Sequence, residues 1–212
     1  MYLKSISNTG IIPVIKLTKI ENSHLLAKAL MDGGIDVAEV TFRAAGAAEV
    51  ISRMTEAQPD MIIGAGTVTT VAQAEEAYKA GAKFIVSPGF EEEIVKWCVE
   101  RELLVLPGCV TPTEIMAAQK LGVKTVKFFP AEQFGGLKTI KALGGPFGAL
   151  KFVPTGGISL KNLDVYAAEP KIAACGGSFM ATDKLLNEEN FEEITALCKE
   201  ARKIIIESRK EK

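Results

Sequence analysis

Histidine is nearly absent from this sequence, in which His24 is the only histidine among 212 residues. The composition excludes zinc sites that need two histidines, and a serine–histidine–aspartate triad would have to use His24. His24 follows Asn22 and Ser23 at a predicted helix start, where a solvent-exposed histidine in the first turn is expected. Acid–base chemistry must therefore come from carboxylate, lysine, tyrosine or cysteine side chains.

Three other features are missing. The four cysteines are scattered and form no CxxC pair, which excludes a disulfide framework or structural zinc site and favours a reducing cytoplasm. No apolar run reaches the roughly 18 residues of a membrane span, and the first eight residues lack the features of a signal peptide. With 25 basic and 26 acidic residues, the net charge of -1 offers no basic excess for a nucleic-acid partner. We expect a cytoplasmic protein that binds neither membrane nor nucleic acid.

What the sequence does contain is a regular alternation of β-rich and amphipathic segments. Eight predicted strands begin 20 to 27 residues apart: 11–15, 36–42, 61–64, 83–87, 103–107, 125–129, 152–155 and 172–175. Helical patterns lie between them, at 23–31, 71–79, 91–101, 112–120 and 137–143, and a last helix is predicted from Asn190 to about Glu207. Each interval has the length of one strand, one helix and two short loops.

An internal Ala-x-x-x-Gly repeat supports this alternation. It occurs before three of the strands and ends at Gly33, Gly81 and Gly122, each of which is expected to take the left-handed position that ends a helix. Eight such units predict a closed (β/α)8 TIM barrel, an α/β fold, in a single domain covering residues 1–212. The alternative is an open doubly wound sheet, but no G-x-G-x-x-G motif follows the first strand.

In such a barrel, functional groups lie at the carboxyl ends of the strands. Alternation along the second strand puts Glu39 and Arg43 on the face opposite the apolar Ala38, Val40 and Phe42, so we expect both charged groups inside the barrel. Charges buried there are costly unless they are paired or used. The alternative is a purely structural Glu39–Arg43 ion pair.

A lysine stands in the sixth strand, where alternation places Lys127 inward between the outward-facing Val126 and Phe128. Burial favours the neutral amine of a lysine, which is a nucleophile toward carbonyl groups. The alternative is a lysine whose side chain extends from the strand end to solvent. Both interpretations stay open on the strand pattern alone.

Glycine-rich segments end the seventh and eighth strands. Thr155-Gly156-Gly157 and Gly176-Gly177-Ser178 fall where barrels frequently bind phosphate through backbone N–H groups. A lone Gly-Gly pair is usually a tight turn, but two in successive loops predict a phosphate site.

Together these motifs carry a family resemblance. Seven segments occur in order: Glu39-Val-Thr-Phe-Arg43, Gly64-Ala-Gly-Thr67-Val, Ser87-Pro88-Gly89, Pro107-Gly-Cys-Val-Thr-Pro-Thr-Glu114, Lys127-Phe-Phe-Pro-Ala131, Pro154-Thr-Gly-Gly157 and Gly176-Gly-Ser178. In these the chain resembles the 2-keto-3-deoxy-6-phosphogluconate (KDPG) and 4-hydroxy-2-oxoglutarate (KHG) aldolases, which are class I pyruvate aldolases on trimeric (β/α)8 barrels. The resemblance implies a small-molecule keto-acid substrate, no cofactor, no metal and a homotrimer.

The resemblance also implies residue roles. It makes Lys127 the Schiff-base lysine and Glu39 the general acid–base residue. The remaining positions would bind substrate: Arg43 and Thr67 at the pyruvyl carboxylate, Pro88 and Phe129 beside the lysine, and Gly156, Gly157 and Ser178 at a phosphate.

The chain departs from the family pattern at two places. Ala44-Ala45-Gly46 follows Arg43 where the family commonly has Thr-Pro, and Phe179 stands where it often has Trp. Both lie near the aldehyde end of the site, so they bear on the choice between the phosphorylated substrate and KHG. Two other functions remain: a metal-dependent sugar-phosphate epimerase or isomerase, and a non-catalytic barrel that binds a phosphorylated ligand and in which Lys127 and Glu39 form a buried ion pair.

Overall fold

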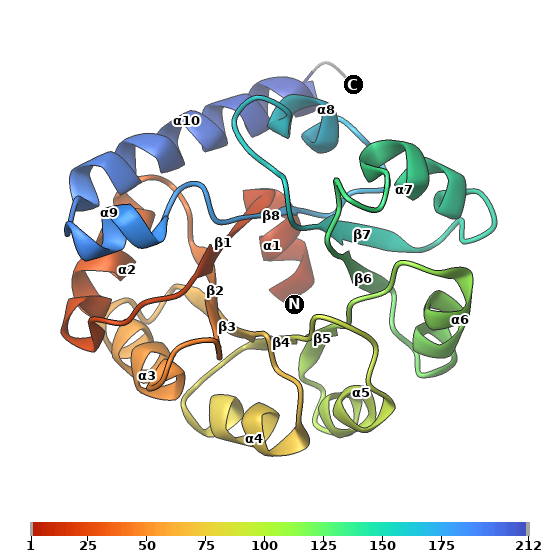
Figure 1. Ribbon diagram of the computed structural model, residues 1–212, viewed down its shortest axis with the longest axis horizontal. Helices are drawn as coiled ribbons and strands as arrows, with labels where there is room; N and C mark the ends of the chain where they lie inside the picture. The colour runs from red at the N-terminus through yellow and green to blue at the C-terminus, as the bar shows by residue number, and fades with distance from the viewer. Residues whose placement is uncertain (1, 211–212) are drawn as a thin grey trace.

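The computed structural model describes residues 2–210, in which strands and helices alternate along the chain (Figure 1). The strands are β1 (Ile11–Ile15), β2 (Val37–Thr41), β3 (Ile62–Gly66), β4 (Phe84–Val86), β5 (Leu104–Leu106), β6 (Thr125–Phe128), β7 (Lys151–Pro154) and β8 (Cys175–Gly177). Every pair of neighbouring strands among them is parallel. A parallel neighbour requires a crossover connection, and a helical segment supplies it here.

The helices lie outside the strands, as Figure 1 shows. They are α1 (Tyr2–Thr9), η1 (Ile20–Asn22, a 3-10 turn), α2 (Ser23–Asp32), α3 (Ala47–Ala57), α4 (Val71–Lys79), α5 (Glu92–Val99), α6 (Pro112–Lys120), α7 (Gly136–Gly144), α8 (Leu163–Ala167), α9 (Asp183–Asn187) and α10 (Phe191–Lys210). The exception is α1, which lies at the amino-terminal ends of the strands. In the view of Figure 1 it appears in the middle, between the strands.

Two curved sheets make up the strand layer. The larger has the order β5-β4-β3-β2-β1-β8, and β6 and β7 form the smaller. Isolated parallel bridges connect the two sheets at both edges, between Gly108 and Lys127 and between Thr155 and Gly176. The register aligns Glu39 of β2 with Gly64 of β3, and Lys127 of β6 with Val153 of β7. Because all the paired strands are parallel, their carboxyl ends lie on the same side of the strand layer, and side chains from distant parts of the sequence meet there.

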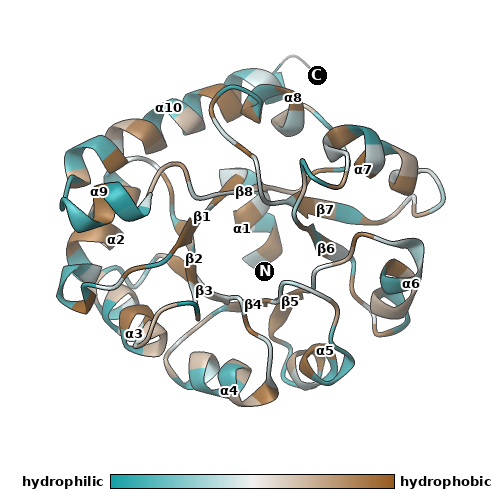
Figure 2. Cartoon of the chain, in the orientation of Figure 1, coloured by the Kyte–Doolittle hydropathy of each residue, from teal (hydrophilic) through white to brown (hydrophobic). Residues whose placement is uncertain are grey.

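The hydrophobic core forms one contiguous cluster that includes residues of every strand. Strands β1 to β4 and β6 are buried at every position, as parallel strands covered on both faces are. In Figure 2 the strands are mostly brown, whereas the helices carry teal segments on their outer sides. Within residues 2–210 no helix is both long enough and apolar enough to cross a membrane.

The sequence predictions of elements need three corrections. Helices α1, α3, α8 and α9 were not predicted. The eighth strand was predicted at 172–175, but β8 runs over Cys175–Gly177. The prediction stopped too early because glycine has a low β-propensity. Consequently Gly176 and Gly177 belong to the strand and not to a loop after it. The predicted left-handed glycine Gly33 is right-handed at φ -80°, and Gly34 after it takes φ +76°, whereas Gly81 and Gly122 are left-handed as predicted.

Candidate active site

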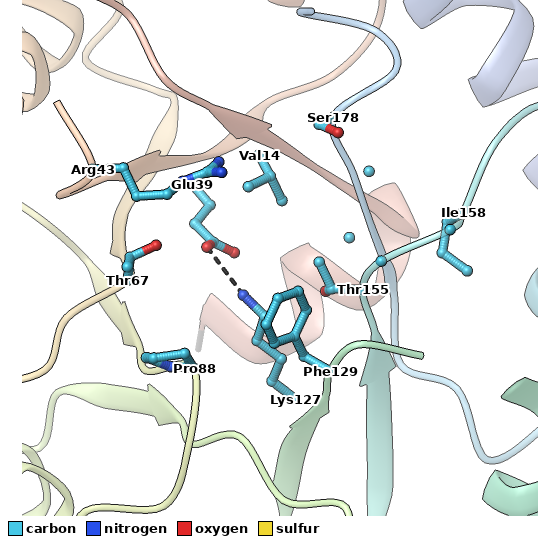
Figure 3. A pocket seen from close by; sticks show the side chains of 14 residues that line it. Val14, Glu39, Arg43, Thr67, Pro88, Lys127, Phe129, Thr155, Ile158 and Ser178 are labelled. Carbon is cyan, nitrogen blue, oxygen red and sulfur yellow. Dashed lines mark hydrogen bonds and ion pairs between the residues drawn. The ribbon is translucent and has the colours of Figure 1, made fainter. Parts of the chain in front are cut away.

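A pocket opens at the carboxyl ends of the strands, where functional groups of this architecture lie. It encloses about 210 Å³ and is shown from close by in Figure 3. All nine residues predicted from the sequence line it: Glu39, Arg43, Thr67, Pro88, Lys127, Phe129, Gly156, Gly157 and Ser178. They come from strands or loops that are up to 139 residues apart, so only the folded chain brings them together.

Lys127 and Glu39 meet at the floor of this pocket. Their side chains point toward one another from β6 and β2, and Nζ of Lys127 lies 3.3 Å from Oε1 of Glu39 (Figure 3). The side chains are only 6% and 3% exposed. Nζ also lies 5.2 Å from the centroid of the Phe129 ring, within reach of a cation–π attraction. The strand alternation correctly predicted that both groups face inward, but the partner of Glu39 is Lys127 and not Arg43.

The absence of a side chain at Gly66 leaves room for the Glu39 carboxylate. A β-carbon at Gly66, in the neighbouring strand β3, would overlap Oε1 of Glu39. Because β2 and β3 pair in register from Val37–Ile62 to Thr41–Gly66, the lack of a side chain at this position leaves room beside the carboxylate. The tight packing limits the positions that the Glu39 side chain can take.

Arg43, Thr67 and Pro88 form one wall of the pocket. In Figure 3 the side chains of all three lie on the same side of the Lys127–Glu39 pair. Arg43 is exposed overall, and its Nε donates to Oγ1 of Thr41 at 3.3 Å, which leaves its terminal guanidinium nitrogens available to an anion. Thr67 has a left-handed backbone with φ +56°, an uncommon conformation for a β-branched residue that concentrates at functional sites.

The loop after β5 supports this wall from behind. A β-carbon at Gly108 would overlap the carbonyl of Pro88, so the two loops are in close contact. A capping box at the start of α6 orders the loop that follows: Glu114 accepts hydrogen bonds from the backbone N–H groups of Val110 and Thr111. Burial disfavours the ionised Glu114, but these bonds outweigh it and lower its pKa.

The opposite wall is made of glycine and a hydroxyl. Gly156 and Gly157 take left-handed φ values of +97° and +83°, which a residue with a β-carbon rarely adopts. Nδ2 of Asn162 donates to the carbonyl of Gly157 at 3.0 Å and fixes the turn. Ser178 is exposed across the pocket from Pro88 (Figure 3). This wall presents backbone and a hydroxyl, which are suitable donors for an anion.

Five lining residues were given no role of their own: Val14, Thr155, Ile158, Gly176 and Gly177. Of these, Thr155, Gly176 and Gly177 stand in the two glycine-rich segments that were predicted to bind phosphate. The most informative is Thr155, because it is 7% exposed and its Oγ1 has no hydrogen-bond partner. A buried hydroxyl without a partner is costly, and a bound ligand would supply one. Its position directly before Gly156-Gly157 at the end of β7 was the available signal.

Other candidate chemistry lies outside this pocket. His24 is exposed, as predicted, and lies beside the Glu21 carbonyl. Burial raises the pKa of Cys98, Cys109, Cys175 and Cys198, in each case to about 12, which keeps the thiols protonated at neutral pH. Within the part of the chain that the structure describes, no cluster of three or more His, Cys, Asp or Glu side chains could hold a metal ion.

A family model described as "KDPG and KHG aldolase" matches residues 3–197. The chain belongs to this aldolase family. It is 43% identical over 202 residues to the 2-dehydro-3-deoxy-phosphogluconate aldolase of Treponema pallidum, with 95% of this chain and 96% of the relative covered. It is 40% identical to the KHG/KDPG aldolase of Escherichia coli K12, with 93% of each chain covered.

Solved structures of the aldolase family agree with this assignment. The KDPG aldolase of Zymomonas mobilis ZM4, solved with 3-phosphoglycerate, has a TM-score of 0.89 at 35% identity and 94% coverage of both chains. The KDPG aldolase of Legionella pneumophila has the same TM-score at 37% identity, with 93% of this chain and 96% of that chain covered. In that structure pyruvate is captured as a covalent carbinolamine intermediate.

The two departures from the family pattern lie beside the pocket, but not at one end of it as expected: Ala44 follows Arg43 and Phe179 follows Ser178, and these two residues lie on opposite walls (Figure 3). Ala44, Ala45, Gly46 and Phe179 are not among its lining residues. Gly46 precedes α3 with φ +77°, and a β-carbon there would overlap the side chain of Ile20. The Phe179 ring packs against Gly177, where a β-carbon would come within 2.8 Å of it. Phe179 therefore contacts a lining residue of the pocket without lining it.

Proposed function

We propose that this protein is a class I aldolase that cleaves 2-keto-3-deoxy-6-phosphogluconate to pyruvate and glyceraldehyde 3-phosphate. The observation that carries the proposal is the buried Lys127–Glu39 pair, at 3.3 Å, in a pocket with a guanidinium at one wall. The relatives' names support the substrate, and the carbinolamine in the Legionella pneumophila enzyme supports the covalent mechanism. Cleavage of 4-hydroxy-2-oxoglutarate to pyruvate and glyoxylate is proposed as a second activity, as the Escherichia coli relative's name suggests.

The first half of the reaction joins Lys127 to the substrate. Transfer of one proton from Nζ to the Glu39 carboxylate leaves a neutral amine, whose lone pair attacks C2 of the keto acid. The carbonyl π electrons move to oxygen, which takes a proton and gives the carbinolamine. Glu39 then protonates this hydroxyl, directly or through a water, and loss of water gives the protonated imine. Arg43 and Thr67 hold the substrate carboxylate meanwhile.

The second half breaks the carbon–carbon bond. Glu39 takes the proton of the C4 hydroxyl, and the C3–C4 bonding electrons move through C3 to the iminium nitrogen. The aldehyde leaves, and the enamine of pyruvate remains on Lys127. Protonation of C3 regenerates an imine, and hydrolysis with one water releases pyruvate and the amine. Every proton and electron pair is accounted for by the lysine, the carboxylate and water, so the sequence of steps requires no cofactor.

The second wall supports a phosphorylated aldehyde portion. The Gly156–Gly157 turn and Ser178 offer backbone and hydroxyl donors on the side of the pocket opposite Arg43. With the substrate carboxylate at Arg43, the phosphate would reach this wall. The unpartnered Thr155 hydroxyl lies between the two ends and is suited to a substrate hydroxyl.

The decisive experiment is reductive trapping with pyruvate and borohydride. We expect the mass of one reduced pyruvyl group on Lys127, located by peptide mass spectrometry. K127M should abolish both the adduct and turnover, whereas K124M should change neither, because Lys124 is exposed just before the same strand. Absence of any adduct in the wild-type protein would rule out the imine mechanism and favour a metal-dependent or non-catalytic function.

Three further features are proposed with this function. We infer that the eight strands form a closed (β/α)8 barrel in a single domain, because bridges join β6 to the loop after β5 and link the residue after β7 to β8. We infer a cytoplasmic homotrimer, as the family resemblance implies. Light scattering of the purified protein tests the trimer, for which a mass near 68 kDa is expected from the 22.7 kDa chain, and a mass near 22.7 kDa would contradict it.

A further inference from the structure

We propose that Tyr166 and Glu132 set the preference for a phosphorylated aldehyde by holding the Glu132 carboxylate away from the Gly156–Gly157 turn. The inference rests on the proposed function, since it concerns the selectivity of the same pocket. Neither residue lines the pocket, so both are positioning residues that act through the turn.

The two residues are joined behind the turn. The Tyr166 hydroxyl, on α8, donates a hydrogen bond to Oε1 of Glu132, in the loop after β6. Tyr166 is 2% exposed. Burial, followed by the hydrogen bond to the Glu132 carboxylate, raises the pKa of Tyr166, so that it stays a donor at neutral pH. The hydrogen bond therefore fixes the direction of a carboxylate whose residue is otherwise exposed.

Glu132 is in direct contact with the glycine turn. A β-carbon at Gly157 would overlap Cγ of Glu132, and the Glu132 backbone N–H donates to the carbonyl of Gly156 at 3.2 Å. Gly136 closes the other side, where a β-carbon would lie 2.6 Å from the Tyr166 hydroxyl. Neither Gly136 nor Gly157 could be replaced by a larger residue without displacing Tyr166 or Glu132.

The contact brings the negative charge of Glu132 close to the proposed phosphate site, and the hydrogen bond from Tyr166 directs that charge away from it. An acidic side chain beside an anion-binding turn repels a phosphate, and because Glu132 is exposed this repulsion weakens as the ionic strength rises. The hydroxyl of Tyr166 draws the carboxylate toward α8. Without it, rotation of the Glu132 side chain about its own bonds brings the charge to Gly157. The distal carboxylate of 4-hydroxy-2-oxoglutarate is bonded directly to C4, whereas the phosphate of 2-keto-3-deoxy-6-phosphogluconate is on C6. The shorter substrate therefore does not extend its charge to this wall.

The test compares both substrates in a mutant cycle. For Y166F we expect the KM for 2-keto-3-deoxy-6-phosphogluconate to rise about tenfold, the size of one lost charge-assisted hydrogen bond. The KM for 4-hydroxy-2-oxoglutarate and the rate of pyruvate trapping should stay within about twofold, a change of less than 0.5 kcal/mol. E132Q keeps an acceptor for Tyr166 but removes the charge, so its effect should be small, and E132Q in the Y166F background should restore most of the lost affinity.

The controls separate the possible failures. Y78F makes the same chemical change on the outer surface, where Tyr78 is 48% exposed, and should leave both substrates unaffected. If Y166F alters both substrates together, or if the double variant shows no recovery, Tyr166 acts only through packing and the inference is wrong. If the wild-type protein traps no pyruvate, the proposed function itself fails, independently of any variant.

Discussion

The backbone of Gly66 lies directly against the carboxylate of Glu39, in the space that a β-carbon would occupy. The strand β3 thus determines where the proposed acid–base group of β2 points, although Gly66 has no side chain to take part in chemistry. The relationship makes the position of Glu39 testable without changing Glu39 itself.

The first prediction concerns G66A. The added methyl group displaces the carboxylate from Lys127, so we expect kcat to fall about 100-fold, as misplacement of a catalytic group by about 1 Å does. Far-UV circular dichroism should stay native. G148A is the matched control, because nothing lies within 4 Å of a β-carbon there. Wild-type kcat in G66A would show that the carboxylate has other productive positions.

The second prediction concerns E39Q. Because the amide cannot accept or deliver the protons of dehydration and C4–O–H cleavage, kcat should fall by roughly 10²–10⁴-fold. The fold should persist, since glutamine has nearly the same shape and still accepts a hydrogen bond from Lys127. Steady-state kinetics and a thermal melt of the same preparation check the two statements. Loss of the fold with little loss of specific activity would instead indicate a structural ion pair.

The third prediction concerns the four cysteines at alkaline pH. Burial raises the pKa of each thiol to about 12 from an ordinary value of 9.0, so the folded state holds protons that the unfolded state releases first. The stabilisation from this source is complete below pH 9 and is lost as the pH rises from about 9 to about 12. Chemical denaturation across this range should show a falling free energy of unfolding.

A thiol reagent provides an independent check of the same burial. At pH 8 the native protein should react with a disulfide reagent only slowly, whereas all four cysteines should react once the chain is unfolded in denaturant. Rapid labelling of the native protein would contradict the buried positions of these thiols.

The fourth prediction concerns the capping box behind Pro88. T111A removes the cap of α6 and should cost about 1 kcal/mol of unfolding free energy. Because the hydrogen bonds to Glu114 lower its pKa, they stabilise the protein above about pH 4.5, and this contribution is lost as the pH falls through the lowered value. The difference between wild type and E114A, measured by urea denaturation, should therefore shrink in acid. A difference that is independent of pH would contradict this linkage.

The sequence predicted the two central groups of the site because both stand in strands with a clear alternation. Inward placement of Glu39 and Lys127 follows from period two alone, but their pairing does not. The relative position of β2 and β6 depends on the seven helices and strands between them, and no local pattern encodes it. This is why both Arg43 and Lys127 were candidate partners for Glu39, and the structure pairs it with Lys127.

Three of the elements that were missed or shifted have a weak local pattern, a reason that does not extend to α1 and α3, which have 8 and 11 residues. Helices α8 and α9 have five residues each, too few for a 3.6-residue period to appear, and β8 is largely glycine. Val14 was missed as a pocket residue, and Thr155 was given no role of its own, because short apolar and β-branched side chains in a strand are typical of the core. The pocket they line exists only where several strand ends meet.

Lys127 and Glu39 stand on different sheets, and the wall opposite Arg43 belongs to the last third of the chain. During synthesis, a ribosome that has made 130 residues has already incorporated the lysine, the glutamate and the arginine, yet Thr155, Gly156, Gly157 and Ser178 are still to come. β8 must then insert beside β1, at the edge of the sheet formed first. We therefore expect a chain that ends before Ser178 to lack turnover, so that the activity of truncated chains would measure completion of the strand layer.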